Sequence, residues 1–311
     1  MNTKAGAGAG AGAAAIRSPR AVVKKIVSRE QGEGVGARVR RSIGSTAMRT
    51  FDPFLMLDEF RIAPPAGFPD HPHRGFSTVT LMLSGAVIHE DFAGHKGVIQ
   101  AGDLQWMCAG KGIVHSEMPA SSAMSHGLQL WVNLKHDEKL VEPEYQELVA
   151  SDIPVASDAG VRVRVIAGTS LGVTAAICTR TPVTFLQVFL EPGAQLNQAL
   201  PHDWNVFVYT LSGQLTTSNG RDDAVVIPPH HTVIYAANEG DDGIVISNDE
   251  ASAEDAHCVI VAGKPIAEPI VQHGPFVMCS EDEIVEAIQD YRHGRNGFER
   301  ARHWSSESGN R

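Results

Sequence analysis

The segment HPHRGFSTVTLMLSG, residues 71–85, joins two histidines to a run of aliphatic and β-branched residues that ends at Ser-Gly. Such a run, closed by a glycine turn, predicts a β-strand. Residues two apart on an extended backbone point to the same side, so His71 and His73 can offer two imidazoles to one metal ion. The stretch FVYTLSGQL at 207–215 resembles VTLMLSGAV at 79–87. This internal repeat predicts two domains of the same kind.

Short strand patterns dominate the chain from residue 21 to about residue 270. They include VVKKIVSRE, GLQLWVNL, VRVRVIAG, VTFLQVFLEPGA, HTVIYA and HCVIVAG. In GLQLWVNL, one face carries Leu128, Leu130, Val132 and Leu134. Strands this short and frequent predict an all-β fold of two tandem barrels. The polar, proline-containing segment 136–160 marks the junction, which gives barrels at 21–152 and 153–304.

The sequence predicts one helix and two tails outside the barrels. Ser280 and Glu283 form a capping box, apolar residues recur after them at Ile284, Val285 and Ile288, and Gly294 can end the helix. The Ala/Gly-rich residues 1–20 are expected to be a disordered tail, and residues 305–311 a second short tail.

Composition restricts the class of protein. The 311 residues carry a formal net charge of −10, which argues against direct nucleic-acid binding because phosphate contacts need a basic face. The local basic stretch from Arg20 to Arg41 is interpreted as solvated faces of two early strands. Four scattered cysteines without a CxxC pair fit a reducing intracellular compartment rather than a disulfide scaffold. No apolar run approaches the ~18–20 residues of a membrane span, so no membrane partner is expected.

A second pair of ligand-type residues lies in the first predicted barrel. HSE places His115 and Glu117 at i and i+2, about forty residues after His71 and His73. One such pair could arise by chance or pack against a turn, but two compatible pairs in one barrel favour a metal site. Three imidazoles and one carboxylate suit Fe(II), Mn, Co, Ni, Cu or Zn, and leave two positions of an octahedron open.

These two motifs make the resemblance specific. HPHRGFSTVTLMLSG followed by GDLQWMCAGKGIVHSEMP resembles the pirin family of the cupin superfamily, and FDPFLMLDEF, VEPEYQEL and NGFERARHW extend the similarity from about residue 21 to residue 304. The resemblance implies two cupin barrels, each a double-stranded β-helix, with one Fe(II) in the N-terminal barrel. Its ligand positions correspond to His71, His73, His115 and Glu117. Ser77 departs from many relatives, which have glutamate there, and this predicts a change in pocket polarity.

The second barrel lacks the ligand pattern. It has His202 without an HxH pair, and the adjacent His230 and His231 would point to opposite faces of a strand. We therefore predict no metal in the second barrel.

The resemblance also implies an activity. Several pirins act as quercetin 2,3-dioxygenases, in which a flavonol coordinates the metal, dioxygen is activated and the heterocycle is cleaved with release of carbon monoxide. Glu117 is then the candidate catalytic base. Phe76, Trp106 and Met107 are predicted to line the pocket, with an ordinary core role as the alternative.

Two alternatives to the dioxygenase stay open, a partner-binding role and a structural metal. The resemblance to mammalian pirins implies an iron-dependent, redox-sensitive transcription co-regulator of the nucleus and cytoplasm that binds a transcription factor, and plant relatives imply a G-protein alpha subunit as partner. A metal with a purely structural role is the second alternative.

Overall fold

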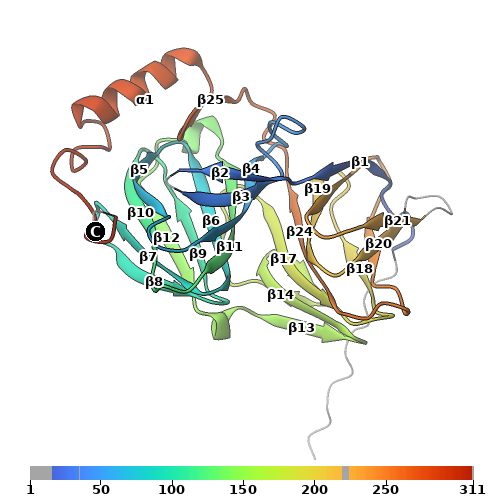
Figure 1. The fold of residues 1–311 in the computed structure, drawn as a ribbon. Helices are drawn as coiled ribbons and strands as arrows, with labels where there is room; N and C mark the ends of the chain where they lie inside the picture. Colours follow the sequence, from blue (N-terminus) through green and yellow to red (C-terminus); the bar gives the residue numbers. More distant parts are fainter. Residues whose placement is uncertain (1–15, 35, 219–223, 310–311) are drawn as a thin grey trace, which may run out of the picture.

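The computed structural model describes residues 16–34, 36–218 and 224–309, and these form two β-barrels that lie side by side (Figure 1). Each barrel combines a seven-stranded sheet with a four-stranded sheet. The all-β fold of two tandem barrels is therefore confirmed. In the described part of the chain, no helix is long and apolar enough to cross a membrane.

The first barrel appears in blue to green in Figure 1. Its larger sheet contains, in spatial order, β12 (Glu144–Leu148), β9 (Leu104–Cys108), β6 (Phe76–Ser84), β11 (Ser125–Asn133), β4 (Phe54–Ile62), β3 (Ala37–Arg41) and β2 (Glu30–Glu33). Its smaller sheet contains β5 (Phe68–His73), β10 (Ile113–Pro119), β7 (Ala86–Asp91) and β8 (Lys96–Gln100).

The second barrel has the same plan. Its larger sheet contains β1 (Val22–Val27), β22 (His231–Tyr235), β19 (Asn205–Ser212), β24 (Ala256–Gly263), β17 (Val183–Leu190), β14 (Val161–Ala167) and β13 (Val155–Asp158). Its smaller sheet contains β18 (Gln195–Ala199), β23 (Gly243–Ser247), β20 (Leu215–Ser218) and β21 (Ala224–Ile227). The remaining elements are β15 (Thr169–Ser170), β16 (Val173–Thr174), β25 (Val271–His273), β26 (Phe276–Met278), the 3₁₀ turns His136–Glu138 and Ala150–Asp152, and α1 (Glu281–His293).

The predicted internal repeat corresponds to the central strands of the two larger sheets. β6 and β19 are each third in spatial order, and each ends before a glycine with a left-handed backbone, Gly85 (φ 71°) and Gly213 (φ 65°). A Cβ atom at these glycines would lie 2.7 Å from the Met124 carbonyl oxygen and 2.5 Å from the Asp255 carbonyl oxygen. Both the dihedral angle and the close backbone approach therefore require glycine at the turn.

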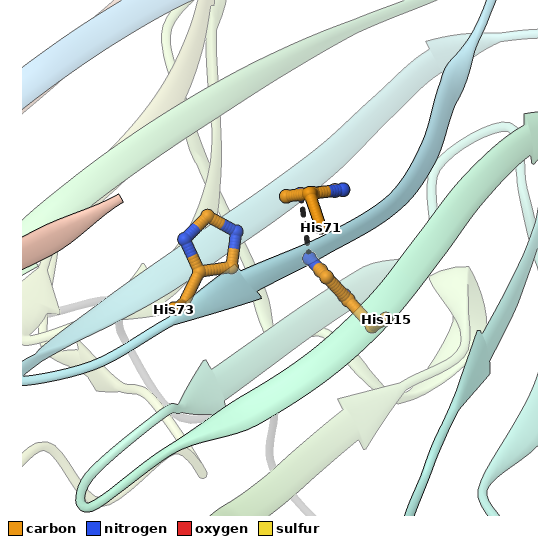
Figure 2. A group of neighbouring side chains, drawn as sticks. All are labelled: His71, His73 and His115. Carbon is orange, nitrogen blue, oxygen red and sulfur yellow. Dashed lines mark hydrogen bonds between the residues drawn. The ribbon is translucent and has the colours of Figure 1, made fainter. Parts of the chain in front are cut away.

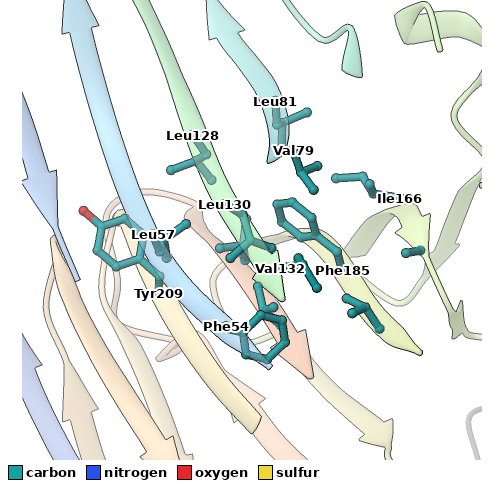
Figure 3. Close-up of a cluster of buried hydrophobic side chains, with 14 of the residues drawn as sticks. Phe54, Leu57, Val79, Leu81, Leu128, Leu130, Val132, Ile166, Phe185 and Tyr209 are labelled. Carbon is teal, nitrogen blue, oxygen red and sulfur yellow. The ribbon is translucent and has the colours of Figure 1, made fainter. Parts of the chain in front are cut away.

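The main core lies between the barrels, where the outer faces of the two larger sheets pack together (Figure 3). Leu128, Leu130 and Val132, three residues of the predicted apolar face of β11, contribute to it, and the second barrel supplies Phe185 and Phe207. Each such side chain contributes about 1.5–3 kcal/mol by burial. A hydrophobic core therefore forms the main contact between the barrels.

The N-terminal segment differs from its predicted placement. β1 pairs with β22 of the second barrel, although the predicted first barrel begins at residue 21. Residues 16–20 also dock there: the fully buried Arg20 donates hydrogen bonds to the carbonyls of Trp204 and Pro201. The strand pattern of β1 could not reveal this, because alternation does not say which sheet a strand joins. The rest of the predicted tail, residues 1–15, lies outside the described residues.

The C-terminal segment packs on the first barrel, although the predicted second barrel extends to residue 304. The buried guanidinium of Arg74 donates to Asp290 of α1 (2.9 Å) and to the Lys111 carbonyl (2.6 Å), and stacks over the Phe298 ring. The capping box and the left-handed Gly294 confirm the predicted helix. Ile284 is buried, but Val285 is 53% exposed because one residue turns a helix by about 100°.

One carboxylate links the two barrels at the edge of their shared core. Glu59 of β4 is 2% exposed and accepts hydrogen bonds from His126 (2.8 Å), Tyr209 (2.5 Å) and His230 (2.8 Å). Burial disfavours its ionisation, but the hydrogen bonds from His126 and Tyr209 and the charge interactions with His230 and His126 together outweigh burial and hold the pKa of Glu59 at about 2. His230 has a left-handed backbone (φ 59°), and its ring reaches Glu59 of the other barrel.

Candidate metal centre

Two neighbouring strands of the first barrel bring three histidines together. His71 and His73 project from β5, and His115, the register partner of His71, projects from β10 (Figure 2). Their ligand-type nitrogens all lie within 4.8 Å of one another, and the Nε2 atoms of His71 and His115 are 3.0 Å apart. The alternation predicted from HPH is present, and His115 of the second motif converges with His71 and His73.

Hydrogen bonding and burial suit these imidazoles to metal binding. The Nδ1 atom of His71 donates to the Pro69 carbonyl (2.8 Å), which leaves its Nε2 lone pair facing the cluster. Burial lowers the pKa of His71 and lowers those of His73 and His115 well below their usual range. Within the described chain, the buried Nδ1 atoms of His73 and His115 have no hydrogen-bond partner. Three neutral, converging imidazoles form a donor set that fits a divalent transition metal.

Glu117 lies on β10, the strand of His115, but outside the group of three histidines. Its Oε1 accepts a hydrogen bond from Thr80 (3.1 Å), and its Oε2 accepts one from Gln129 (3.0 Å). Burial raises the pKa of Glu117 to about 7, against the effect of these two hydrogen bonds. The carboxylate faces the same cavity as His71 and His73. Its role as a fourth ligand stays a prediction.

A cavity of about 520 Å³ opens beside the histidines. Its apolar walls come from Leu55, Met56, Phe60, Phe68 and Trp131. These pocket residues were not found from the sequence, although Trp131 stands on the face of GLQLWVNL opposite the leucines. That alternation was the available signal for an inward-facing aromatic residue.

The three predicted pocket residues lie elsewhere, so that prediction is wrong. Trp106 belongs to the core between the barrels, and Met107 packs under the C-terminal segment. Phe76 stands behind the site, with its ring centroid 5.2 Å from that of His73 and 4.4 Å from that of Trp131. It supports the histidine and the tryptophan without lining the cavity. Their core role, the alternative interpretation, is the observed one.

Ser77 does not change the polarity of the pocket. The residues on either side of it along β6 turn to the barrel interior, whereas Ser77 shares the outer face with Val79 and pairs with Cys108 of β9. It is buried and is not a lining residue of the cavity. The expectation drawn from this departure is therefore wrong for a simple reason, the period of two along a strand.

A row of polar side chains crosses the floor of the cavity. Gln129 pairs in register with Thr80 on one side and with Asp58 on the other, and Asp58 pairs with Arg41. Arg41 binds Asp58 through two hydrogen bonds (2.9 and 2.6 Å) and Glu33 through a third (2.8 Å). The row leads from the Glu117 carboxylate across the sheet to the outermost strands.

The corresponding strands of the second barrel carry aliphatic residues. β18 and β23 turn Leu196, Ile244 and Ile246 into an interior core. Of the histidines noted in this half, His230 binds Glu59 of the first barrel, and the partly exposed His231 donates from its Nδ1 atom to the Pro229 carbonyl. The interior of this barrel is thus a packed core without ligand-type side chains at the corresponding positions.

The fold and the histidine cluster define a two-barrel cupin with a metal-type centre in its N-terminal barrel. The pirin family model matches residues 36–132, and the model of the pirin C-terminal cupin domain matches residues 185–297. The chain is 52% identical to pirin of Homo sapiens over 295 residues, which cover 94% of this chain and 99% of that protein. It is 51% identical to a pirin-like protein of Solanum lycopersicum over 289 residues, 93% and 97% of the two chains. The chain therefore belongs to the pirin family.

The solved structures include a related enzyme. The quercetin 2,3-dioxygenase of Acinetobacter baumannii superposes with a TM-score of 0.79 at 30% identity, and the match covers 89% of this chain and 98% of that one.

Proposed function

We propose that the protein is an Fe(II)-dependent dioxygenase that acts on flavonols of the quercetin type. The observation that carries this proposal is the junction of three neutral imidazoles with a cavity of about 520 Å³ whose walls are aromatic and aliphatic. A flat aromatic substrate needs such walls, and a chelating oxygen needs the metal at one end. The related quercetin 2,3-dioxygenase structure supports the same substrate class.

Different residues of this chain would hold the metal, orient the substrate and accept its proton. His71, His73 and His115, with Glu117 as a fourth ligand, would hold the iron, which when bound supplies open coordination positions and redox chemistry. Trp131 and the other apolar lining residues orient the aromatic rings and exclude water. Thr80 and Gln129 fix the carboxylate of Glu117, so that it can accept the proton of the substrate hydroxyl.

The test is dioxygen consumption by the iron-loaded protein with quercetin, together with detection of carbon monoxide. Turnover should disappear in His115→Ala and fall by about 10²–10⁴-fold in Glu117→Gln, the range for loss of a general base. His231→Ala, which removes a partly exposed imidazole of the second barrel, should leave turnover unchanged. Turnover no greater than that of free iron would refute the dioxygenase and favour the partner-binding alternative.

A further inference from the structure

Arg49 contributes a free positive charge to the wall of the cavity. It lines the same cavity as His71 and His73, and its side chain is exposed. Across the described ranges of the chain, it takes part in no hydrogen bond and no ion pair. Its guanidinium is therefore available to a ligand without the cost of breaking an internal contact.

The backbone that carries Arg49 is held in place. The loop between β3 and β4 is closed by hydrogen bonds from Gly44 N to the Met48 carbonyl (2.8 Å) and from Met48 N to the Ser45 carbonyl (3.1 Å). The Met48 side chain packs against the core between the barrels. The root of the Arg49 side chain is thus fixed relative to the cavity, which reduces the entropy lost on binding.

The other charged lining residues are already engaged. Arg41 is bound by Asp58 and Glu33, and Asp70 accepts hydrogen bonds from Ser306. Glu117 is bound by Thr80 and Gln129, and a divalent ion held by this carboxylate and the three neutral imidazoles would give that end of the cavity a net charge of +1. The remaining lining carboxylates, Glu33, Asp58 and Asp70, are held by Arg41 and Ser306, so Arg49 is the lining cation without an internal partner among the described residues.

We propose that the preferred substrates are flavonol-like chelators that carry an anionic substituent, a sulfate or a carboxylate, for which Arg49 is the specificity-determining residue. This inference rests on the proposed function, because it assigns the chelating part of the ligand to the histidine centre. Arginine suits both anions because its planar fork can donate two parallel hydrogen bonds to either group. The apolar lining accommodates the rings between the two polar contacts.

The experiment compares quercetin with a flavonol that carries a sulfate ester and with a flavonol that carries a ring carboxylate. Dissociation constants are measured by fluorescence titration on the metal-free protein and on the iron-loaded protein without oxygen, and kcat/KM follows from dioxygen consumption. The wild type should bind the anionic flavonols about tenfold more tightly than quercetin at low salt, and less so at high salt. Arg49→Gln should abolish this preference, and Arg49→Lys should retain part of it.

Arg292→Gln is the matched control, because it removes the same charge from an exposed position on α1 away from the cavity. The inference is overturned if the wild type binds all three flavonols equally, or if Arg49→Gln and Arg292→Gln reduce the preference equally. A preference for only one anion identifies sulfate or carboxylate as the group recognised. Turnover of quercetin without any Arg49-dependent preference refutes this inference alone, whereas Arg49-dependent binding without turnover refutes the dioxygenase alone.

Discussion

Replacing Glu59 by glutamine should remove the electrostatic link between the two barrels. The Glu59 carboxylate is 2% exposed, and its donors come from both barrels: His126 from the first, Tyr209 and His230 from the second. Glutamine has nearly the same size, so the apolar packing around it is preserved. The variant therefore isolates the negative charge and its hydrogen bonds from the core.

The magnitude follows from the depressed pKa of Glu59. The native value of about 2 against an ordinary value of 4.5 corresponds to about 3 kcal/mol of folding free energy. A carboxyl group with a lowered native pKa stabilises the folded state above its unfolded pKa. This contribution should therefore be complete above about pH 5, and it should be lost as the pH falls from 4.5 towards 2.

The assay is urea denaturation of the wild type and Glu59→Gln between pH 7 and pH 2. The variant should be about 3 kcal/mol less stable at pH 7, and this difference should shrink towards zero as the pH approaches 2. Glu142→Gln, which breaks an exposed ion pair with Lys111, is the control and should cost at most about 1 kcal/mol. A stability difference between wild type and Glu59→Gln that does not change with pH would refute the reasoning.

Three further predictions concern the first barrel. Arg74→Met removes the buried partner of Asp290, which keeps Arg295 and Asn296, and should cost about 1.5–3 kcal/mol, measured by calorimetry. An unchanged melting temperature contradicts a role for this pair in docking α1. Deletion of residues 305–311 removes the hydrogen bonds that Ser306 N and Ser308 N donate to Asp70 and Glu90, and should therefore speed the loss of the metal to a chelator. An unchanged rate of metal loss means that this segment does not support β5. A divalent metal at a thousand times its Kd should raise the free energy of unfolding by about 4 kcal/mol. His71→Ala should abolish this increase, and an increase that persists in the variant places the metal elsewhere.

The sequence predicted the features that depend on local periodicity. The period of two predicted that His71 and His73 share one side of β5. It also predicted that the leucines of β11 share one face, which is the face that packs in the core between the barrels. The capping box of α1 was equally local, since Ser280 and Glu283 satisfy each other's backbone donors within one turn. Such features require no knowledge of distant partners, and the structure contains them at the predicted residues.

The features that escaped prediction depend on contacts between distant segments. β1 could have completed either sheet, and its alternation is the same in both cases. The partners of Glu59 come from positions 126, 209 and 230, and no spacing in the sequence marks them. Pocket residues were missed for a related reason: Leu55 and Trp106 are both apolar strand residues, and the sheet pairing alone decides which one faces the cavity.

The two barrels have the same strand arrangement, but the interior of the second is aliphatic and that of the first contains a polar cavity. This difference explains why the first barrel is stabilised by contacts on its outer surface. In the second barrel, Leu196, Ile244 and Ile246 fill the inside and stabilise it directly. In the first barrel, an apolar cluster that includes Phe60, Met82 and Ile99 fills only part of the corresponding space. The rest holds ligand-type histidines, a polar row and an open cavity, so the burial that a barrel interior normally supplies is reduced. Its compensation lies outside: one sheet packs against the second barrel, and α1 with its neighbouring strands covers the end of β5 and β10. A barrel can keep a polar cavity for chemistry when its stabilising core is moved to its outer surface, and the second barrel provides that surface.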